Sequence, residues 1–176
     1  MIPLVSTIDW GALSYQNARD LPMVLADIER AKKWDPGALG QTSGQWDEIA
    51  ASTYGEGNVP DAAYAVIPCL VEMAVSQPHR TDEERCLVIS TTVDTVVGGY
   101  KGSAGVPSRL YAVFNRGIQQ ARSLALALHT AELPAGLRLN VVAGRLLAPA
   151  TLVAANPFKV TPCGNLPKLG CGVTNL

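Results

Sequence analysis

The sequence predicts one all-α domain followed by a short tail of different character. Signals for helix starts recur through the first two thirds of the chain, and apolar residues spaced three and four apart follow them. The 176 residues are 48% hydrophobic and 16% charged, a composition typical of a compact globular chain. We expect a helical domain over residues 1–155, on which residues 156–176 pack as an irregular or small β tail.

The first predicted helix covers residues 21–28. Asp20 precedes it as an N-cap, and Pro22 lies in its first turn, where the missing N–H of proline costs no hydrogen bond. The apolar residues that share one face of this helix are Leu21, Val24, Leu25 and Ile28.

Two capping boxes mark further helix starts. In each, a threonine and a Gln or Glu three residues later bond each other's backbone N–H groups; the pairs are Thr42 with Gln45 and Thr81 with Glu84. The helix that follows Thr81 runs through residues 88–97. These residues are rich in β-branched side chains, so a strand remains the alternative there.

Proline punctuates the rest of the helical region. A start signal at residues 58–61 precedes an apolar segment that Pro68 interrupts, and because proline lacks an N–H we expect a kink or a restart near Ile67. Pro107 opens the longest periodic segment, which extends to about Ala131, and a last helix is expected over residues 137–147. The buried stripe of the long helix comprises Leu110, Val113, Phe114, Ile118, Ala121, Leu124, Ala125 and Leu128.

Charge is distributed unevenly along the chain. Residues 1–100 carry 14 acidic and 6 basic residues, whereas residues 101–176 carry 1 acidic and 8 basic residues. Each part can therefore steer a partner of opposite charge or a second copy of the chain, unless the two parts neutralise each other across the fold. The chain has no long apolar run, no basic leader before a hydrophobic stretch and no dense cysteine framework, so we expect a cytoplasmic protein without a membrane span.

Two ordered sets of residues carry a resemblance to known proteins. The first set is Ile8, Asp9, Trp10, Ala18, Asp20, Pro22 and Leu25. The second set is Tyr54, Gly55, Glu56, Gly57, Asn58, Val59, Ala62, Tyr64, Ala65, Ile67, Pro68 and Leu70. Over roughly residues 8–130 the chain resembles a group of bacterial HEAT-like helical-repeat proteins, in which His and Gln usually stand at the positions of Gly55 and Glu56.

The resemblance implies an α-solenoid of stacked antiparallel helix pairs, a fold that leaves an extended binding surface. Related proteins often carry a Cys-rich β tail, and residues 158–164 resemble a remnant of one. The genes of some related proteins are neighbours of bacterial toxin genes. No catalytic residue carries over.

Metal and cofactor sites are not expected. Cys163 and Cys171 in the tail provide two of the four ligands of a structural zinc site, but zinc ligands usually come in close pairs and the other two are missing. His79 and His129 lie far away in sequence, and Cys69 lies in an apolar helix. No catalytic sequence motif is found either, so the protein is not expected to be an enzyme.

Three basic residues are candidates for weak anion binding. Lys101 lies in a Gly-rich segment at 98–105 just before a predicted helix, but its order Lys-Gly-Ser is not that of a P-loop, which favours a plain connection. Arg109 and Arg116 are one heptad apart on one face of the following helix, where they would bind phosphate or carboxylate. A solvated helix face is the alternative.

Acidic and aromatic residues lie close together in the N-terminal half, which favours a contact surface for a basic protein. The candidate residues are Asp9, Trp10, Asp47, Glu48, Glu56 and Asn58. The alternative for Trp10, and for the neighbouring Trp46, is burial in the core.

These observations predict a non-enzymatic binding protein that presents an acidic N-terminal surface to a basic protein, such as an immunity protein that neutralises a bacterial toxin. The alternative is a protein that binds or modifies nucleic acid with the basic C-terminal half. A third hypothesis is a homo-oligomer formed by the ends of opposite charge.

Overall fold

A computed structural model describes residues 2–34, 45–53, 59–101, 105–130 and 133–148, except for the side chains of residues 98–101. Within these residues the chain forms six α-helices and four short 3-10 helices, and no strand. The α-helices are α1 (Leu21–Arg30), α2 (Gln45–Thr53), α3 (Ala63–Ser76), α4 (Asp82–Lys101), α5 (Tyr111–Ala127) and α6 (Ala135–Arg145). The all-α prediction is confirmed for the described residues, and the predicted tail lies outside them.

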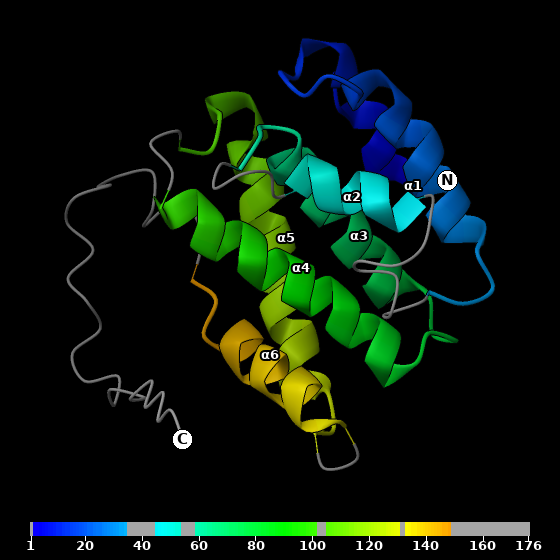
Figure 1. The fold of residues 1–176 in the computed structure, drawn as a ribbon, viewed down its shortest axis with the longest axis vertical. Helices are drawn as coiled ribbons and strands as arrows, with labels where there is room; N and C mark the ends of the chain where they lie inside the picture. The colour runs from blue at the N-terminus through cyan, green and yellow to red at the C-terminus, as the bar shows by residue number, and fades with distance from the viewer. Residues whose placement is uncertain (1, 35–44, 54–58, 102–104, 131–132, 149–176) are drawn as a thin grey trace, which may run out of the picture.

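The helices pack in a regular order. Each α-helix contacts its neighbour in the chain and also the helix two places further on, so that α1 packs on α3, α2 on α4, α3 on α5 and α4 on α6. Figure 1 shows α4 crossing in front of α3 and α5, with α1 and α6 at opposite ends of the molecule. The first twenty residues add three 3-10 helices, η1 (Pro3–Thr7), η2 (Trp10–Ala12) and η3 (Ala18–Asp20), which the sequence did not predict.

Helix α3 forms the centre of the core. Almost all of its side chains are buried, because α1, α2, α4 and α5 surround it. The helix continues through Pro68, so of the predicted kink or restart near Ile67 the restart is wrong. Gly117 of α5 meets the proline; a Cβ added there would lie 2.9 Å from Pro68 Cα. Close packing on α5 therefore compensates for the roughly 3 kcal/mol that an interior proline costs a helix.

A buried cluster joins the end of α1 to the start of α4. Arg80 is 2% exposed, and its guanidinium lies 4.2 Å from the ring centroid of Trp34 and 3.5 Å from the carboxylate of Glu84. It also donates hydrogen bonds to the carbonyl of Glu29 in the last turn of α1, at 3.3 Å, and to that of Ala31 just after the helix, at 2.8 Å. One side chain therefore links three segments of the chain.

The Thr81–Glu84 capping box is confirmed within this cluster. The Glu84 N–H donates to Thr81 Oγ1 at 3.2 Å, and the Thr81 N–H donates to Glu84 Oε2 at 2.8 Å. The other carboxylate oxygen accepts the Trp34 N–H at 2.5 Å. Burial by itself would raise the pKa of Glu84, but the hydrogen bonds from Trp34 and Thr81 and the charge of Arg80 outweigh it and lower that pKa.

Most other predicted helix features are also found. Residues 88–97 are helical rather than extended, and residues 137–147 largely coincide with α6. Helix α1 starts after Asp20, but the Asp20 side chain makes no capping bond because the preceding residues are already helical in η3. Helix α5 ends at Ala127, earlier than predicted. Helix α2 begins at Gln45, and its predicted cap at Thr42 lies outside the described residues.

Two cysteines, Cys69 and Cys86, are free and fully buried. Burial raises the pKa of both thiols, that of Cys86 to about 11, with smaller contributions from nearby carboxylates. Both therefore remain neutral apolar packing groups at physiological pH.

The contact between Gly117 and Pro68 predicts a large effect of one methyl group. Gly117→Ala should lower the free energy of unfolding by about 1–3 kcal/mol, because the new Cβ meets the backbone of α3. The control is Gly136→Ala in α6, where nothing lies within 4 Å of the added Cβ and better helix propensity should leave stability equal or slightly higher. Urea denaturation measures both, and equal effects would contradict the close approach.

The lowered pKa of Glu84 predicts a pH-dependent contribution to stability. Its ionised form stabilises the fold fully above the ordinary pKa of 4.5, and this stabilisation is lost as pH falls through the lower folded pKa. Glu84→Gln should therefore cost about 2–4 kcal/mol at neutral pH and less at pH values near 3. Urea titrations at several pH values measure the difference in the free energy of unfolding between the native chain and this variant. Glu83→Gln is the neighbouring control. A difference that does not change with pH would contradict the conclusion that ionised Glu84 stabilises the fold.

Candidate partner-binding surface

Three carboxylates face one hollow between α1 and α2. The hollow has a volume of about 300 Å³ and is lined by Asn17, Asp20, Val24, Asp27, Gln45 and Glu48. Asp20, the N-cap of α1, and Asp27 are seven residues apart and so lie on one side of that helix, and Glu48 comes from the first turn of α2. The contact between the two helices brings these carboxylates together.

Glu48 is fixed in this hollow by two hydrogen bonds. Its Oε1 accepts the Tyr15 hydroxyl at 2.8 Å and the Asn17 side-chain amide at 3.2 Å. Burial, together with the hydrogen bond and the charge of Glu48, raises the pKa of Tyr15 to about 12. The carboxylate therefore links α2 to the segment before α1 and has little freedom to turn away.

The other two carboxylates are more accessible. Asp20 is exposed. Asp27 pairs with Arg30 one turn further along α1 at 2.5 Å, but both side chains are exposed, by 40% and 72%, so water weakens this pair. A hollow lined by several carboxylates concentrates negative potential at its mouth and favours a cation there.

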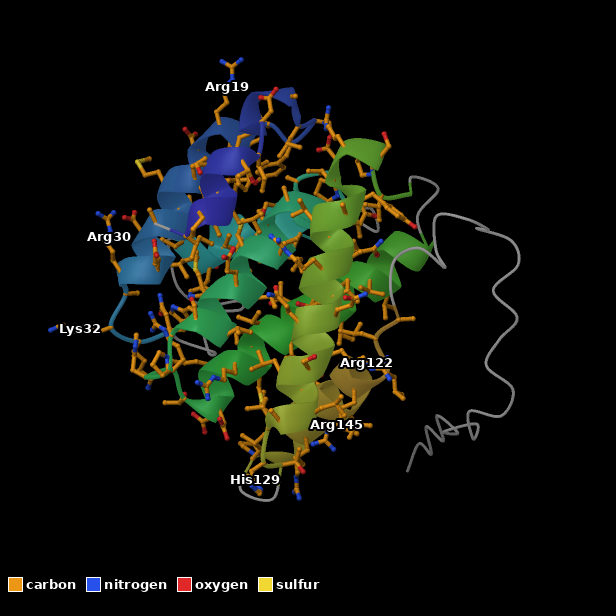
Figure 2. The ribbon with its side chains drawn as sticks, turned by 180° about the vertical axis from the view of Figure 1, so that it is seen from behind. Arg19, Arg30, Lys32, Arg122, His129 and Arg145 are labelled. Atoms are coloured by element: carbon orange, nitrogen blue, oxygen red, sulfur yellow. The ribbon has the colours of Figure 1, made fainter. Side chains whose placement is uncertain are left out.

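Charges of both signs are balanced in the first described segment of the chain. Within residues 2–34 the acidic residues Asp9, Asp20, Asp27 and Glu29 are matched by Arg19, Arg30, Lys32 and Lys33. Figure 2 shows Arg19, Arg30 and Lys32 pointing outward from the edge of the molecule. The charge of a sequence half therefore does not translate directly into the charge of a face.

The predicted partner-binding residues have different environments. Asp9 and Asp47 are exposed, and Glu48 lines the hollow. Trp10 is buried and donates its indole N–H to the Val5 carbonyl at 2.9 Å, so it belongs to the core. Trp46 is also buried, and its ring centroid lies 5.9 Å from that of Trp34 in an edge-to-face arrangement. Glu56 and Asn58 lie outside the described residues.

The basic candidates do not form one anion site. Arg109 donates to the Ala12 carbonyl at 2.6 Å and to Asp61 at 3.2 Å, and Asp61 also accepts from the N–H and hydroxyl of Ser14 at 2.8 Å. Arg109 thus fastens the N-terminal segment to the rest of the fold. Arg116 is exposed and lines a separate groove beside α5.

The prediction of a loop over residues 98–105 is wrong for residues 98–101. Residues 98–101 form the last turn of α4, so Lys101 ends a helix instead of preceding one. A helix C-terminus carries the negative end of the dipole and cannot offer N–H groups to an anion as a helix start does. Residues 102–104 lie outside the described part.

The sequence interpretation missed the role of Asp20 and Asp27 in this hollow. The sequence predicts Asp20 as an N-cap and as one of the residues of the resemblance, and it predicts no role for Asp27. Their spacing of seven residues on a predicted helix would have placed them on one side, but only the packing of α2 against that side could show that Glu48 joins them.

Neither metal ligation nor membrane insertion is indicated by the described residues. In this part of the chain no group of three or more His, Cys, Asp or Glu side chains is arranged to hold a metal ion. None of the helices described here is both long and apolar enough to cross a bilayer. Cys163 and Cys171 lie outside the described residues. No family model, curated protein or solved structure matches this chain.

The contact between Tyr15 and Glu48 predicts a shift in tyrosine ionisation. Glu48→Gln should lower the pKa of Tyr15 from about 12 toward the ordinary 10.0, but not all the way, because burial is the largest cause and remains. The absorbance of tyrosinate during an alkaline titration measures the change, and the Tyr15→Phe variant identifies which signal belongs to Tyr15. An unchanged Tyr15 titration would show that Glu48 does not face it.

Proposed function

We propose that this protein binds another protein through the surface around the acidic hollow, and that the partner presents basic side chains there. The observation that supports this most strongly is the convergence of Asp20, Asp27 and Glu48 on one hollow from two helices. A Lys or Arg side chain of the partner would enter the hollow and pair with these carboxylates.

Apolar contact beside the charges supports the same proposal. Val24 lines the hollow, and Met23 on the same helix is 64% exposed. The hydrocarbon stem of a Lys or Arg side chain can pack on these apolar side chains, while its charged head pairs with the carboxylates. The two hydrogen bonds to Glu48 hold one carboxylate in place before binding, which reduces the conformational entropy lost on association.

The stacking of α-helices supports a HEAT-like architecture for this binding protein, since each helix packs on the helix two places further along. An exposed apolar face at the last described helix, formed by Leu139, Val142 and Leu146, resembles the uncovered end of such a stack. Two buried free thiols are in line with a cytoplasmic location. A bacterial toxin with a basic surface is one partner that would fit, in which case the protein acts as its immunity protein.

Nucleic-acid binding by the C-terminal half is less well supported. Binding to nucleic acid usually requires several cations directed at phosphates. Arg109 is already bonded to Asp61 and a backbone carbonyl, and a phosphate would have to displace both. The side chain of Arg145 donates to the carbonyls of Ala125 and Leu128 at the end of α5, at 2.9 and 3.1 Å.

Charge reversal in the hollow tests the proposal. Mass spectrometry of proteins retained by the immobilised chain at low salt identifies the partner, and surface plasmon resonance of the purified pair then measures association. Asp20→Lys combined with Asp27→Lys should lower the association rate constant about tenfold or more at low salt, because it reverses the steering field.

The control for this experiment is Asp94→Lys in α4, an exposed acidic residue that does not line the hollow. It should change the rate constant by about twofold or less, since screening weakens charges beyond roughly 10 Å. Circular dichroism checks that all variants remain folded. A partner that binds the reversed variant as fast as the native protein would contradict the proposal.

A further inference from the structure

A second concave surface lies on another part of the molecule. It is a groove of about 580 Å³ between the end of α3, the start of α4 and the length of α5. Its apolar part is formed by Val75, Leu124 and Leu128, and the side chain of Val75 is unusually accessible for its type, at 50%. This surface shares no lining residue with the acidic hollow.

The groove changes in polarity along α5. Arg116, Gln120 and Ser123 follow one another at helical spacing on the side that lines the groove, and the apolar residues Leu124 and Leu128 come after them. An occupant with one polar and one apolar part would therefore bind in a single direction.

Arg116 is the cation that this groove offers to a ligand. The other arginine on its wall, Arg85, is bonded to Asp82 at 3.3 Å and to the carbonyls of Ala74 and Pro78 at 3.4 Å. Arg116 is exposed, and no side chain of the described residues forms an ion pair with it. A carboxylate on the occupant would complement its charge.

The amide and hydroxyl groups beside Arg116 favour a peptide as occupant. Gln119, Gln120 and Ser123 can each donate and accept hydrogen bonds, as the N–H and C=O groups of a peptide backbone require. Gln119 and Ser123 are exposed, so the groove is open along its rim, whereas ligands without backbone groups, such as fatty acids, are usually held in more enclosed apolar cavities.

We propose that this groove binds a peptide segment of a partner protein in which an Asp or Glu lies next to apolar residues. The carboxylate pairs with Arg116, the peptide backbone bonds to Gln119, Gln120 and Ser123, and the apolar side chains lie on Val75, Leu124 and Leu128. The proposal does not depend on the acidic hollow and holds or fails separately from it.

A nearby carboxylate provides an internal competitor. Arg116 also lines an adjacent hollow of about 470 Å³ together with Glu72, whose Oε2 is buried and accepts no hydrogen bond within the described structure. Glu72 repels an approaching carboxylate and attracts Arg116 away from the groove. Its removal should therefore strengthen binding, which is the opposite of what loss of a ligand-contacting residue would do.

Selection from a phage-displayed heptapeptide library on the folded full chain tests this proposal. The enriched peptides should contain an Asp or Glu flanked by Leu, Ile, Val or Phe. For a synthetic enriched peptide, fluorescence anisotropy should show about fivefold weaker binding when its acidic residue is changed to the amide. Arg116→Gln should weaken binding of the acidic peptide about fivefold and abolish its advantage over the amide, whereas Glu72→Gln should tighten binding.

The matched control is Arg122→Gln, which removes an exposed arginine from the same helix outside the groove. This variant should bind the acidic peptide with the same affinity as the native chain. The proposal is overturned if no acidic peptides are enriched, if Arg116→Gln keeps the preference for the acidic peptide, or if Arg122→Gln weakens binding as much. It is also overturned if decanoate displaces the peptide and binds more tightly, because the groove would then be a fatty-acid site.

Discussion

The fold depends on the burial of the Arg80 guanidinium, whose lost hydration must be replaced by contacts within the protein. A guanidinium that is 2% exposed is strongly disfavoured unless charge and hydrogen bonds replace the lost water. Here the replacement comes from the Glu84 carboxylate in the first turn of α4, the carbonyls of Glu29 and Ala31, and the ring face of Trp34. Because these groups belong to different segments, the burial of Arg80 is compensated only when α1, the α3–α4 turn and the start of α4 are in place together.

This constraint also positions the acidic hollow. Trp34 packs edge to face with Trp46 of α2, and its indole donates to the Ile28 carbonyl of α1 at 2.9 Å. The tryptophan that covers Arg80 therefore contacts α1 and α2, which carry Asp27 and Glu48, and α1 directly follows Asp20. The buried charge and the accessible charges are thus connected through one aromatic contact.

Local sequence rules predicted much of the helical structure because those rules act over three or four residues. The Thr81–Glu84 box is satisfied by groups within one turn, and the stripe of α5 follows from its own spacing. Pro68 does not end its helix, although an interior proline often does. Its environment depends on Gly117, which is 49 residues away in the sequence, and no local pattern contains that contact.

The candidate sites were less predictable than the helices, because a site depends on which side chains the fold has already used. Arg109 and Arg116 share one helical face in the sequence, yet Arg109 pairs with Asp61 while Arg116 stays accessible beside a groove. The acidic residues of the N-terminal half differ in the same way. Glu48 accepts hydrogen bonds within the fold, whereas Asp20 is exposed. Net charge per segment counts all of these groups equally. Only the fold distinguishes charges that stabilise the protein from charges that remain available to a partner.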